Sequence, residues 1–308
     1  MKEAIIHNID SLLELRLSEL ISKANEVRCK SVGSKLELCN ILNAKSGSCS
    51  EDCKFCAQSS YHSAGVSTYS LKNVEEIVKA AQNAKEIGAQ KFGVVTSGNR
   101  LTQEEINTIS QAIREIKKTI DITICASLGA LTREDMKMLK HSGLSLYHHN
   151  IETSPRFYPK IVSTHSFQQR LDTVKAAKDL GLEVCSGVLI GMGEDWQDRI
   201  DMVMLLKDLD VDSVPINFLV PIKGTPFESL PPISRDEAIR TICIFRIVLK
   251  DKVIKIAAGR EAILKDFQSA GFTAGANGML IGGYLTVKGN DLERDYKLID
   301  EIKELWKE

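Results

Sequence analysis

The sequence predicts a parallel (β/α)8 barrel of the TIM type with an N-terminal helical extension. Short apolar runs alternate with longer amphipathic segments from about residue 36 to residue 285, and eight such runs occur. The two clearest amphipathic segments repeat apolar residues every three or four positions and are followed by glycine, as helices often are. Eight strands, each followed by a helix or helical turn, favour a closed parallel barrel.

The elements follow in a regular order. The predicted strands are LELCNIL (36–42), KFGVVT (91–96), ITICAS (122–127), LSLYHHN (144–150), LEVCSGVL (182–189), SVPINFL (213–219), VIKIAAG (253–259) and GMLIGG (278–283). Helical stretches such as VEEIVKAAQNAKEIG and FQQRLDTVKAAKDLG lie between them. Residues 1–35 are expected to form the extension, and residues 36–308 the barrel with a closing helix. In such a barrel the chemistry lies at the C-terminal ends of the strands.

Composition and charge indicate an ordinary globular protein. The 308 residues include 40 basic and 41 acidic side chains, so nothing predicts binding to nucleic acid or to an anionic membrane. No apolar run approaches the roughly 20 residues of a membrane helix. The N-terminus has no cleavage signature of a signal peptide, so a cytoplasmic location is expected. In that compartment the eight cysteines are not expected to form structural disulfides.

Three of these cysteines crowd into one loop after the first predicted strand. Cys49, Cys53 and Cys56 form a CxxxCxxC motif. One loop with this spacing can place three thiolates at three corners of a [4Fe–4S] cluster and leave the fourth iron open. The alternatives are a zinc site or three unrelated thiols, but zinc usually takes four closed ligands, or three that include histidine or carboxylate. The cluster is the favoured interpretation.

The motif resembles that of the radical SAM superfamily, whose open iron binds S-adenosylmethionine (SAM). The resemblance extends to biotin synthases along residues 47 to 286. The segments that carry it are GSCSEDCKFCAQSS, SLYHHNIETSPRFYPKIVSTHSFQQRLDTV, EVCSGVLIGMGE, SVPINFLVPIKGTP, AAGRE and AGANGMLIGGYLT. By this resemblance the catalytic cluster ligands are Cys49, Cys53 and Cys56.

The resemblance also implies binding residues for SAM and for the substrate dethiobiotin. Asn150 and Asn217 match asparagines that bind the ureido ring, and an amide offers the donor and acceptor that such a ring needs. The commoner role of a lone asparagine is a turn or strand-end cap. The implied SAM contacts are Phe55, Asn150, Glu152, Arg170 and Ile190, and the implied contacts to the substrate carboxylate are the backbone amides of Thr286 and Val287.

The sequence departs from the family at a second iron–sulfur cluster, which supplies the inserted sulfur. Cys125 and Cys185 match two of its ligands, but Gly93 replaces the third cysteine and Lys255 the arginine. Cys39, on the first strand, stands where the familiar enzymes have serine. We expect Cys39, Cys125 and Cys185 to hold a different auxiliary cluster, of cubane type with an extra sulfide, and Lys255 to be a neighbour that offsets its charge. The alternative is that Cys39 is a small buried hydrophobe.

The implied activity is radical SAM sulfur insertion into dethiobiotin. The implied partners are a flavodoxin or ferredoxin as electron donor and a second copy of the chain in a homodimer. Two other functions stay open on the sequence: a biotin-synthase-like paralogue, such as a maturase or mutase, and a non-catalytic iron–sulfur or zinc barrel. Cys29 and Cys243 are expected to be packing residues.

Overall fold

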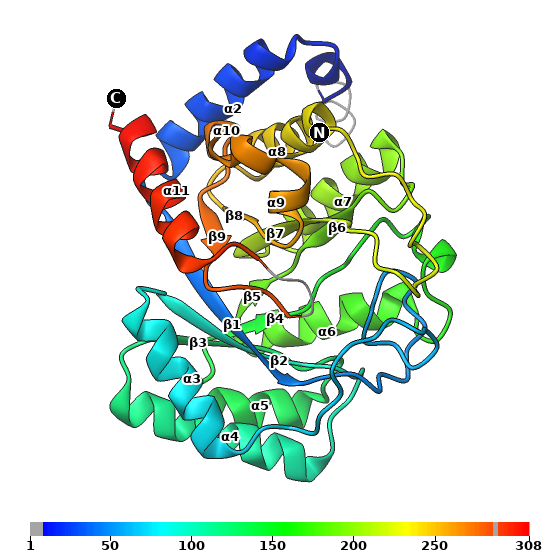
Figure 1. Ribbon diagram of the computed structural model, residues 1–308, viewed down its shortest axis with the longest axis vertical. Helices are drawn as coiled ribbons and strands as arrows, with labels where there is room; N and C mark the ends of the chain where they lie inside the picture. The colour runs from blue at the N-terminus through cyan, green and yellow to red at the C-terminus, as the bar shows by residue number, and fades with distance from the viewer. Residues whose placement is uncertain (1–8, 286–288, 308) are drawn as a thin grey trace.

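A computed structural model describes residues 9–285 and 289–307 and confirms the predicted barrel. The strands pair in parallel in the order β5-β4-β3-β2-β1-β9-β8-β7-β6, and a further pairing of β5 with β7 closes the sheet. Helices surround the strands (Figure 1). The strands are β1 Glu37–Lys45, β2 Lys91–Thr96, β3 Thr123–Ser127, β4 Leu146–His148, β5 Glu183–Cys185, β6 Val188–Ile190, β7 Ser213–Phe218, β8 Val253–Ile256 and β9 Gly278–Leu280. The longer helices are α2 Leu17–Ser31, α3 Val74–Glu86, α4 Gln103–Thr119, α5 Arg133–Ser142, α6 Phe167–Asp179, α7 Trp196–Asp208, α8 Arg235–Leu249 and α11 Leu292–Leu305, with the short α9 Arg260–Ile263 and α10 Gln268–Thr273 before β9.

The helices form for the reasons that their sequences indicate. In α4, for example, Ile106, Ile109, Ile113 and Ile116 recur at helical spacing and are buried against the barrel. The predicted glycines follow α3 and α6, where Gly88 and Gly181 adopt φ values of 83° and 70°. This left-handed conformation terminates a helix at little cost only in glycine.

The fifth barrel strand differs from the prediction, because it consists of two pieces, β5 and β6. The break falls at Gly187, where β7 passes so closely that an added Cβ would lie 2.1 Å from the Pro215 carbonyl oxygen. The Gly187 N–H therefore has no ladder partner and donates to Asn150 Oδ1 at 2.9 Å. The predicted end of the seventh strand is also wrong, because β8 stops at Ile256 and the Ala258 N–H donates to Asn217 Oδ1.

The N-terminal helix α2 packs on α8 at one end of the molecule. Its buried positions are Leu20, Ala24 and Arg28, so the expectation that Cys29 is a packing residue is wrong: one position further round the helix, its side chain is exposed. Cys243 is buried, as expected. Residues 1–8 lie outside the described part, and the division at residue 35 stays a prediction.

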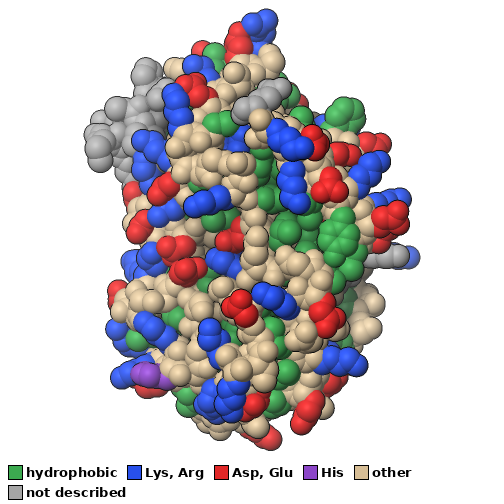
Figure 2. Space-filling model, turned by 90° about the vertical axis from the view of Figure 1, so that its left-hand side faces the viewer, with side chains coloured by type: hydrophobic (Ala, Val, Ile, Leu, Met, Phe, Trp, Pro, Cys, Tyr) green, Lys and Arg blue, Asp and Glu red, His purple; other side chains and the backbone are tan. Residues whose placement is uncertain are grey.

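The surface agrees with the balanced charge of the sequence. On the face that Figure 2 displays, basic and acidic side chains are interspersed. Within residues 9–285 and 289–307, no helix is both long enough and apolar enough to span a membrane.

A buried ion pair fastens the closing helix to the barrel. Arg260 follows β8, Asp295 lies on α11, and both side chains are 1% exposed with 2.5 Å between Nη2 and Oδ1. Asp295 Oδ2 also accepts from the Gly282 N–H. Removal of Asp295 leaves the buried Arg260 charge with only the Glu261 carboxylate, 3.2 Å from Nε, as a partner.

We therefore expect Asp295→Ala to lower the free energy of unfolding by about 3 kcal/mol, the lower end of the usual effect of breaking a buried pair, because Glu261 still contacts Arg260. Urea denaturation monitored by circular dichroism measures this change. Asp300→Ala on the same helix is the control, because Asp300 is 79% exposed and pairs only with Lys303 in the described structure. Equal unfolding midpoints for the two variants would contradict the anchoring role.

Candidate active site

The barrel encloses a cavity of about 330 Å³ that runs along its axis. Side chains alternate across a strand, so every second residue of each barrel strand points inward. Apart from Asn40 and Ala126, the lining residues of these strands follow this rule: Cys39 and Ile41 of β1, Lys91, Gly93 and Val95 of β2, Cys125 and Ser127 of β3, Leu146 and His148 of β4, Pro215 and Asn217 of β7, and Lys255 of β8. A second cavity of about 170 Å³ adjoins it at the C-terminal rim and shares Ser127, His148, Asn150 and Glu152.

The three-cysteine loop forms one wall of the rim cavity. Cys49 and Cys53 line it, and Cys53 is only 7% exposed. Cys56 follows in a tight turn, in which its N–H donates to the Cys53 carbonyl at 2.9 Å. The thiols are close enough for each charge to influence the others, and burial raises the pKa of Cys56 to about 11.

The loop is held in place by the segment that follows β4. The Asp52 carboxylate accepts from the N–H groups of Ser163 at 2.9 Å and Thr164 at 3.2 Å and from both hydroxyls. The Lys54 N–H donates to the Ile161 carbonyl at 3.0 Å. Charge-assisted hydrogen bonds of this kind are stronger than neutral ones. The two loops therefore form one unit, which fixes the positions of the thiols.

Glu152 and Arg170 face each other in the rim cavity. Arg170 Nη1 lies 3.9 Å from Glu152 Oε1 and donates to the Asn150 carbonyl at 2.9 Å. Arg170 Nε also donates to the Tyr158 hydroxyl at 2.6 Å. Burial raises the pKa of Glu152, although Arg170 opposes the change. Glu152 adopts a φ of 66°, an uncommon conformation for a residue other than glycine.

The rim cavity also contains polar atoms without protein partners. Among the described residues, Thr96 Oγ1 and His149 Nε2 are buried and make no hydrogen bond. Both residues line this cavity. Buried polar groups are nearly always hydrogen-bonded, so such atoms indicate a place for a polar ligand.

The predicted amide pair lies where the two cavities meet. Asn150 Oδ1 accepts from His148 Nε2 at 2.8 Å as well as from Gly187, and its Nδ2 lies 3.4 Å from Glu152 Oε2. Asn217 Nδ2 donates to the Val188 carbonyl at 3.1 Å, and its Oδ1 accepts from Ala258. Both side chains thus cap strand ends and also line the axial cavity.

The remaining predicted contacts line neither cavity or lie outside the described residues. Phe55, between Cys53 and Cys56, packs against the apolar cluster that contains Cys53 and Phe157. Ile190 is fully buried in the main core. Thr286 and Val287 lie outside the described residues. Tyr284 and Leu285, directly before them, line the axial cavity.

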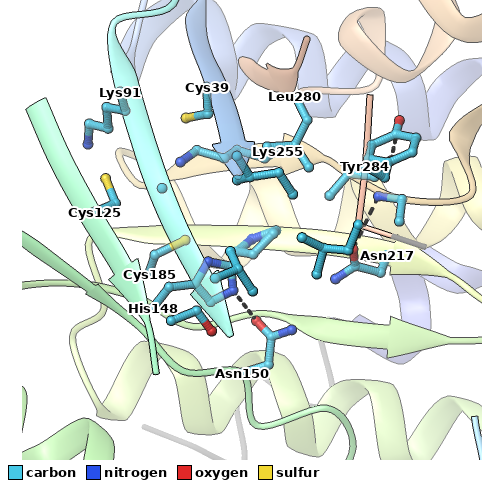
Figure 3. Close-up of a pocket in the computed structure, with 18 of the residues that line it drawn as sticks. Cys39, Lys91, Cys125, His148, Asn150, Cys185, Asn217, Lys255, Leu280 and Tyr284 are labelled. Atoms are coloured by element: carbon cyan, nitrogen blue, oxygen red, sulfur yellow. Dashed lines mark hydrogen bonds between the residues drawn. The ribbon is translucent and has the colours of Figure 1, made fainter. Parts of the chain in front are cut away.

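The structure brings Cys39, Cys125 and Cys185 to the opposite, N-terminal end of the axial cavity, around the Lys255 side chain (Figure 3). Burial raises the pKa of Cys39 to about 11. Burial also opposes ionisation of Cys185, but His148 and Lys255 lower its pKa to about 6. At Gly93 an added Cβ would lie 3.1 Å from Ile41 and 4.0 Å from the Cβ of Cys125. Gly93 lines the cavity beside these thiols, and a larger residue there would crowd Ile41.

Several polar residues at this end were not predicted. Glu37 Oε1 lies 2.8 Å from Lys255 Nζ, and Glu37 Oε2 lies 3.0 Å from Lys91 Nζ. His148 contacts Cys185 on one side and Asn150 on the other, and the Ser213 hydroxyl donates to Cys185 Sγ at 3.0 Å. The alternation of side chains along a strand could have indicated two of them. Glu37 precedes Cys39 by two residues and Lys91 precedes Gly93 by two, so each pair shares one face of its strand.

Both sets of thiols offer the residue type that iron–sulfur clusters use as ligands. In the described part of the chain, no three His, Cys, Asp or Glu side chains are arranged to hold one metal ion. A cluster distributes its thiolates over separate irons, so its ligands need not converge on one point.

Comparisons with known proteins agree along nearly the whole chain. Residues 45–206 match the Radical SAM superfamily, and residues 215–303 match the Biotin and Thiamin Synthesis associated domain. The chain is 51% identical to a biotin synthase of Thermotoga petrophila, over 96% of this chain and 98% of that protein. It is 54% identical to a biotin synthase of Thermotoga neapolitana, over 88% and 98%.

Solved structures agree in fold. Methylornithine synthase has a TM-score of 0.83 at 21% identity and covers 97% of this chain and 92% of its own. The FeFe-hydrogenase maturase HydG from Carboxydothermus hydrogenoformans has a TM-score of 0.80 at 20% identity and covers 97% and 78%. At such identities the likeness concerns the barrel alone.

The loop contacts generate a test that needs no cofactor. We expect Asp52→Ala to increase amide exchange at Lys54 about tenfold, because the loss of several hydrogen bonds to a charged group costs on the order of 1–2 kcal/mol. Hydrogen–deuterium exchange of the 49–56 peptide measures it, and Asp172→Ala on the exposed face of α6 is the control. Unchanged exchange in Asp52→Ala would show that the loop does not depend on this carboxylate.

Proposed function

The chain belongs to the biotin synthases of the radical SAM superfamily, and we propose that its two sets of cysteines act at the two ends of the adjoining axial and rim cavities. The reaction is the insertion of sulfur into dethiobiotin to give biotin. The observation that carries the proposal is the axial cavity itself, with Cys39, Cys125 and Cys185 at one end, Glu152 at the other and two asparagine amides between them.

At the rim, Cys49, Cys53 and Cys56 would hold the [4Fe–4S] cluster. That group, when bound with SAM, supplies the 5′-deoxyadenosyl radical that removes hydrogen from the unactivated carbons C9 and C6 of dethiobiotin. The protein's task is to orient the cosubstrate. Glu152 would accept from its ribose hydroxyls and Arg170 would face its carboxylate, with Phe55, Asn150 and Ile190 as further contacts.

The amide pair has the hydrogen-bonding capacity that the ureido ring needs. Asn217 keeps one N–H and one oxygen lone pair after its bonds to Val188 and Ala258. The oxygen of Asn150 already accepts twice, so Asn150 can offer only an N–H. Asn217 would therefore accept from a ring N–H, and both amides would donate to the ring carbonyl. The predicted carboxylate contacts, Thr286 and Val287, lie outside the described residues.

At the inner end, Cys39, Cys125 and Cys185 would hold an auxiliary cluster of cubane type with an extra sulfide. That cluster, when bound, supplies the sulfur. Gly93 lines the cavity at this end and adds no side chain to it, which supports a bulky group there. Lys255 is better placed to offset negative charge than to be a ligand, because the thiols and Glu37 keep its pKa well above the ordinary value despite burial.

The partners complete the proposal. We expect a flavodoxin or ferredoxin to deliver the electron, a homodimer and a cytoplasmic location. The paralogue alternative, a maturase or mutase, is not retained, because the curated relatives at 42–54% identity are biotin synthases, whereas the likeness to the maturase HydG concerns fold alone.

Removal of a rim ligand should stop all radical chemistry. We expect Cys53→Ala to abolish formation of both 5′-deoxyadenosine and biotin in an anaerobic assay with SAM, dethiobiotin and a strong one-electron reductant, because one corner of the cluster loses its thiolate. Cys243→Ala is the control, since Cys243 is buried on α8 away from both sites. Wild-type protein that is fully loaded with iron but leaves SAM intact would contradict the proposed function.

Removal of an inner ligand should leave cleavage of SAM intact and impair insertion of sulfur. We expect Cys39→Ala to retain formation of 5′-deoxyadenosine, to contain less iron and sulfide, and to lower biotin formation at least about a hundredfold, since even loss of an outer-shell partner can cost that much. Iron and sulfide analysis after anaerobic reconstitution measures the content, again with Cys243→Ala as the control. An unchanged content would eliminate Cys39 as a ligand.

A further inference from the structure

The N-terminal mouth of the barrel carries charged residues that the reaction at the other mouth does not use. Glu37, Lys91 and Glu183 are the first residues of β1, β2 and β5. Lys91 Nζ lies 3.0 Å from Glu37 and 3.3 Å from Glu183, and Glu37 also contacts Lys255 at 2.8 Å. This end of a TIM-type barrel ordinarily contributes only to stability.

The exposure of these side chains decreases from the solvent toward the inner thiols. The side chain of Glu183 is 54% exposed, those of Lys91 and Glu37 are 15% and 17% exposed, and that of Lys255 is 6% exposed. Lys91 and Lys255 line the axial cavity on the same side as Cys39 and Cys125, away from Asn150 and Tyr284 (Figure 3). The charges of both lysines act on Cys125.

The inner part of this group carries more positive than negative charge. The ammonium groups of Lys91 and Lys255 share the carboxylate of Glu37, whereas the second carboxylate, that of Glu183, lies further out and is 54% exposed. Burial of ions costs several kcal/mol for each, and an apolar plug would close the barrel without that cost. Gly278 allows the arrangement, because an added Cβ would lie 2.8 Å from Cγ of Lys255. The excess positive charge therefore indicates attraction of an anion.

The reaction identifies the chemical class of that anion. If the auxiliary cluster gives up a sulfur atom in each turnover, as the proposed function has it, a small sulfur anion must replace it. SAM and dethiobiotin are expected to fill the cavity from the C-terminal mouth, where the asparagines and Glu152 lie. A separate entry at the opposite mouth would keep the supply of sulfur independent of the substrate.

We propose that Lys91, Lys255 and Glu37 form an anion-selective entry through which hydrosulfide reaches Cys39, Cys125 and Cys185. The entry binds and passes the anion, and no covalent bond forms or breaks there. Lys91 attracts the anion at the mouth, and Lys255 receives it beside the thiols. This inference rests on the proposed function for its ligand, but the selectivity for anions is a property of the chain alone.

The test compares two alkylating reagents on the reduced, cluster-free full chain. Iodoacetate and iodoacetamide transfer nearly the same group to a thiolate but differ in charge, so the ratio of their rates at one cysteine cancels that thiol's own reactivity. Peptide mass spectrometry measures this ratio at Cys39 and Cys125. We expect Lys91→Met to lower the iodoacetate-to-iodoacetamide ratio about tenfold, the lower limit of electrostatic steering, and added salt to reduce the wild-type ratio.

Two further variants establish the route. Glu183→Gln, at a largely exposed position that folding tolerates, removes a negative charge outside the mouth and should raise the ratio. Lys85→Met is the matched control, because Lys85 lies on α3 and contacts Asp121, away from the cavity. Ratios that change less than about twofold in both Lys91→Met and Glu183→Gln would overturn the entry. Because no cluster is present, that result would leave the predictions for Cys39→Ala and Cys53→Ala untouched.

Discussion

Closure of a parallel sheet is the constraint on which the whole site depends. Once eight strands form a closed barrel, every second side chain of each strand points into one narrow axial cavity. Cys39, Cys125 and Cys185 are separated by 86 and 60 residues in the chain, yet they share one end of that cavity because each is the third residue of its strand and lines the cavity. The loops that leave the other end carry the second set of cysteines.

A buried cation is stabilised at each end of the barrel interior, by different residues. At the rim, Arg170 faces Glu152 and is bonded to Tyr158 and the Asn150 carbonyl. At the inner end, the side chains of Lys255 and Lys91 both contact the Glu37 carboxylate. In each case a cation is held where thiolate groups must stay negative. A buried cation there is stable only because a carboxylate and hydrogen-bond acceptors replace its water.

His148 connects the two ends. It contacts Cys185, and its Nε2 bonds to Asn150 Oδ1, while the neighbouring amide nitrogen lies 3.4 Å from Glu152. Asn150 in turn occupies the gap between β5 and β6 by accepting from Gly187. The positions of the inner thiol, the amide and the rim carboxylate are therefore coupled through one short segment, residues 148–152. Reactions between fixed groups gain from such pre-organisation.

The sequence by itself determined the barrel and the motif of the rim cysteines, because these depend on periodicity and on close spacing along the chain. Alternation placed Cys39 and Ile41 on one face of a strand, but only the structure showed that this face lines the cavity. It did not determine the partners of Lys255, the contact of His148 with Cys185, or the break in the fifth strand. Each of these joins residues from different strands, and local sequence carries no signal for which strands meet at a given height. The expectation that Cys29 is a packing residue was wrong for a related reason, since only the packing of α2 on α8 decides which side of that helix is buried. The tertiary structure alone brings Glu37, Lys91 and Lys255 together, because the register between β1, β2 and β8 is set by closure of the barrel.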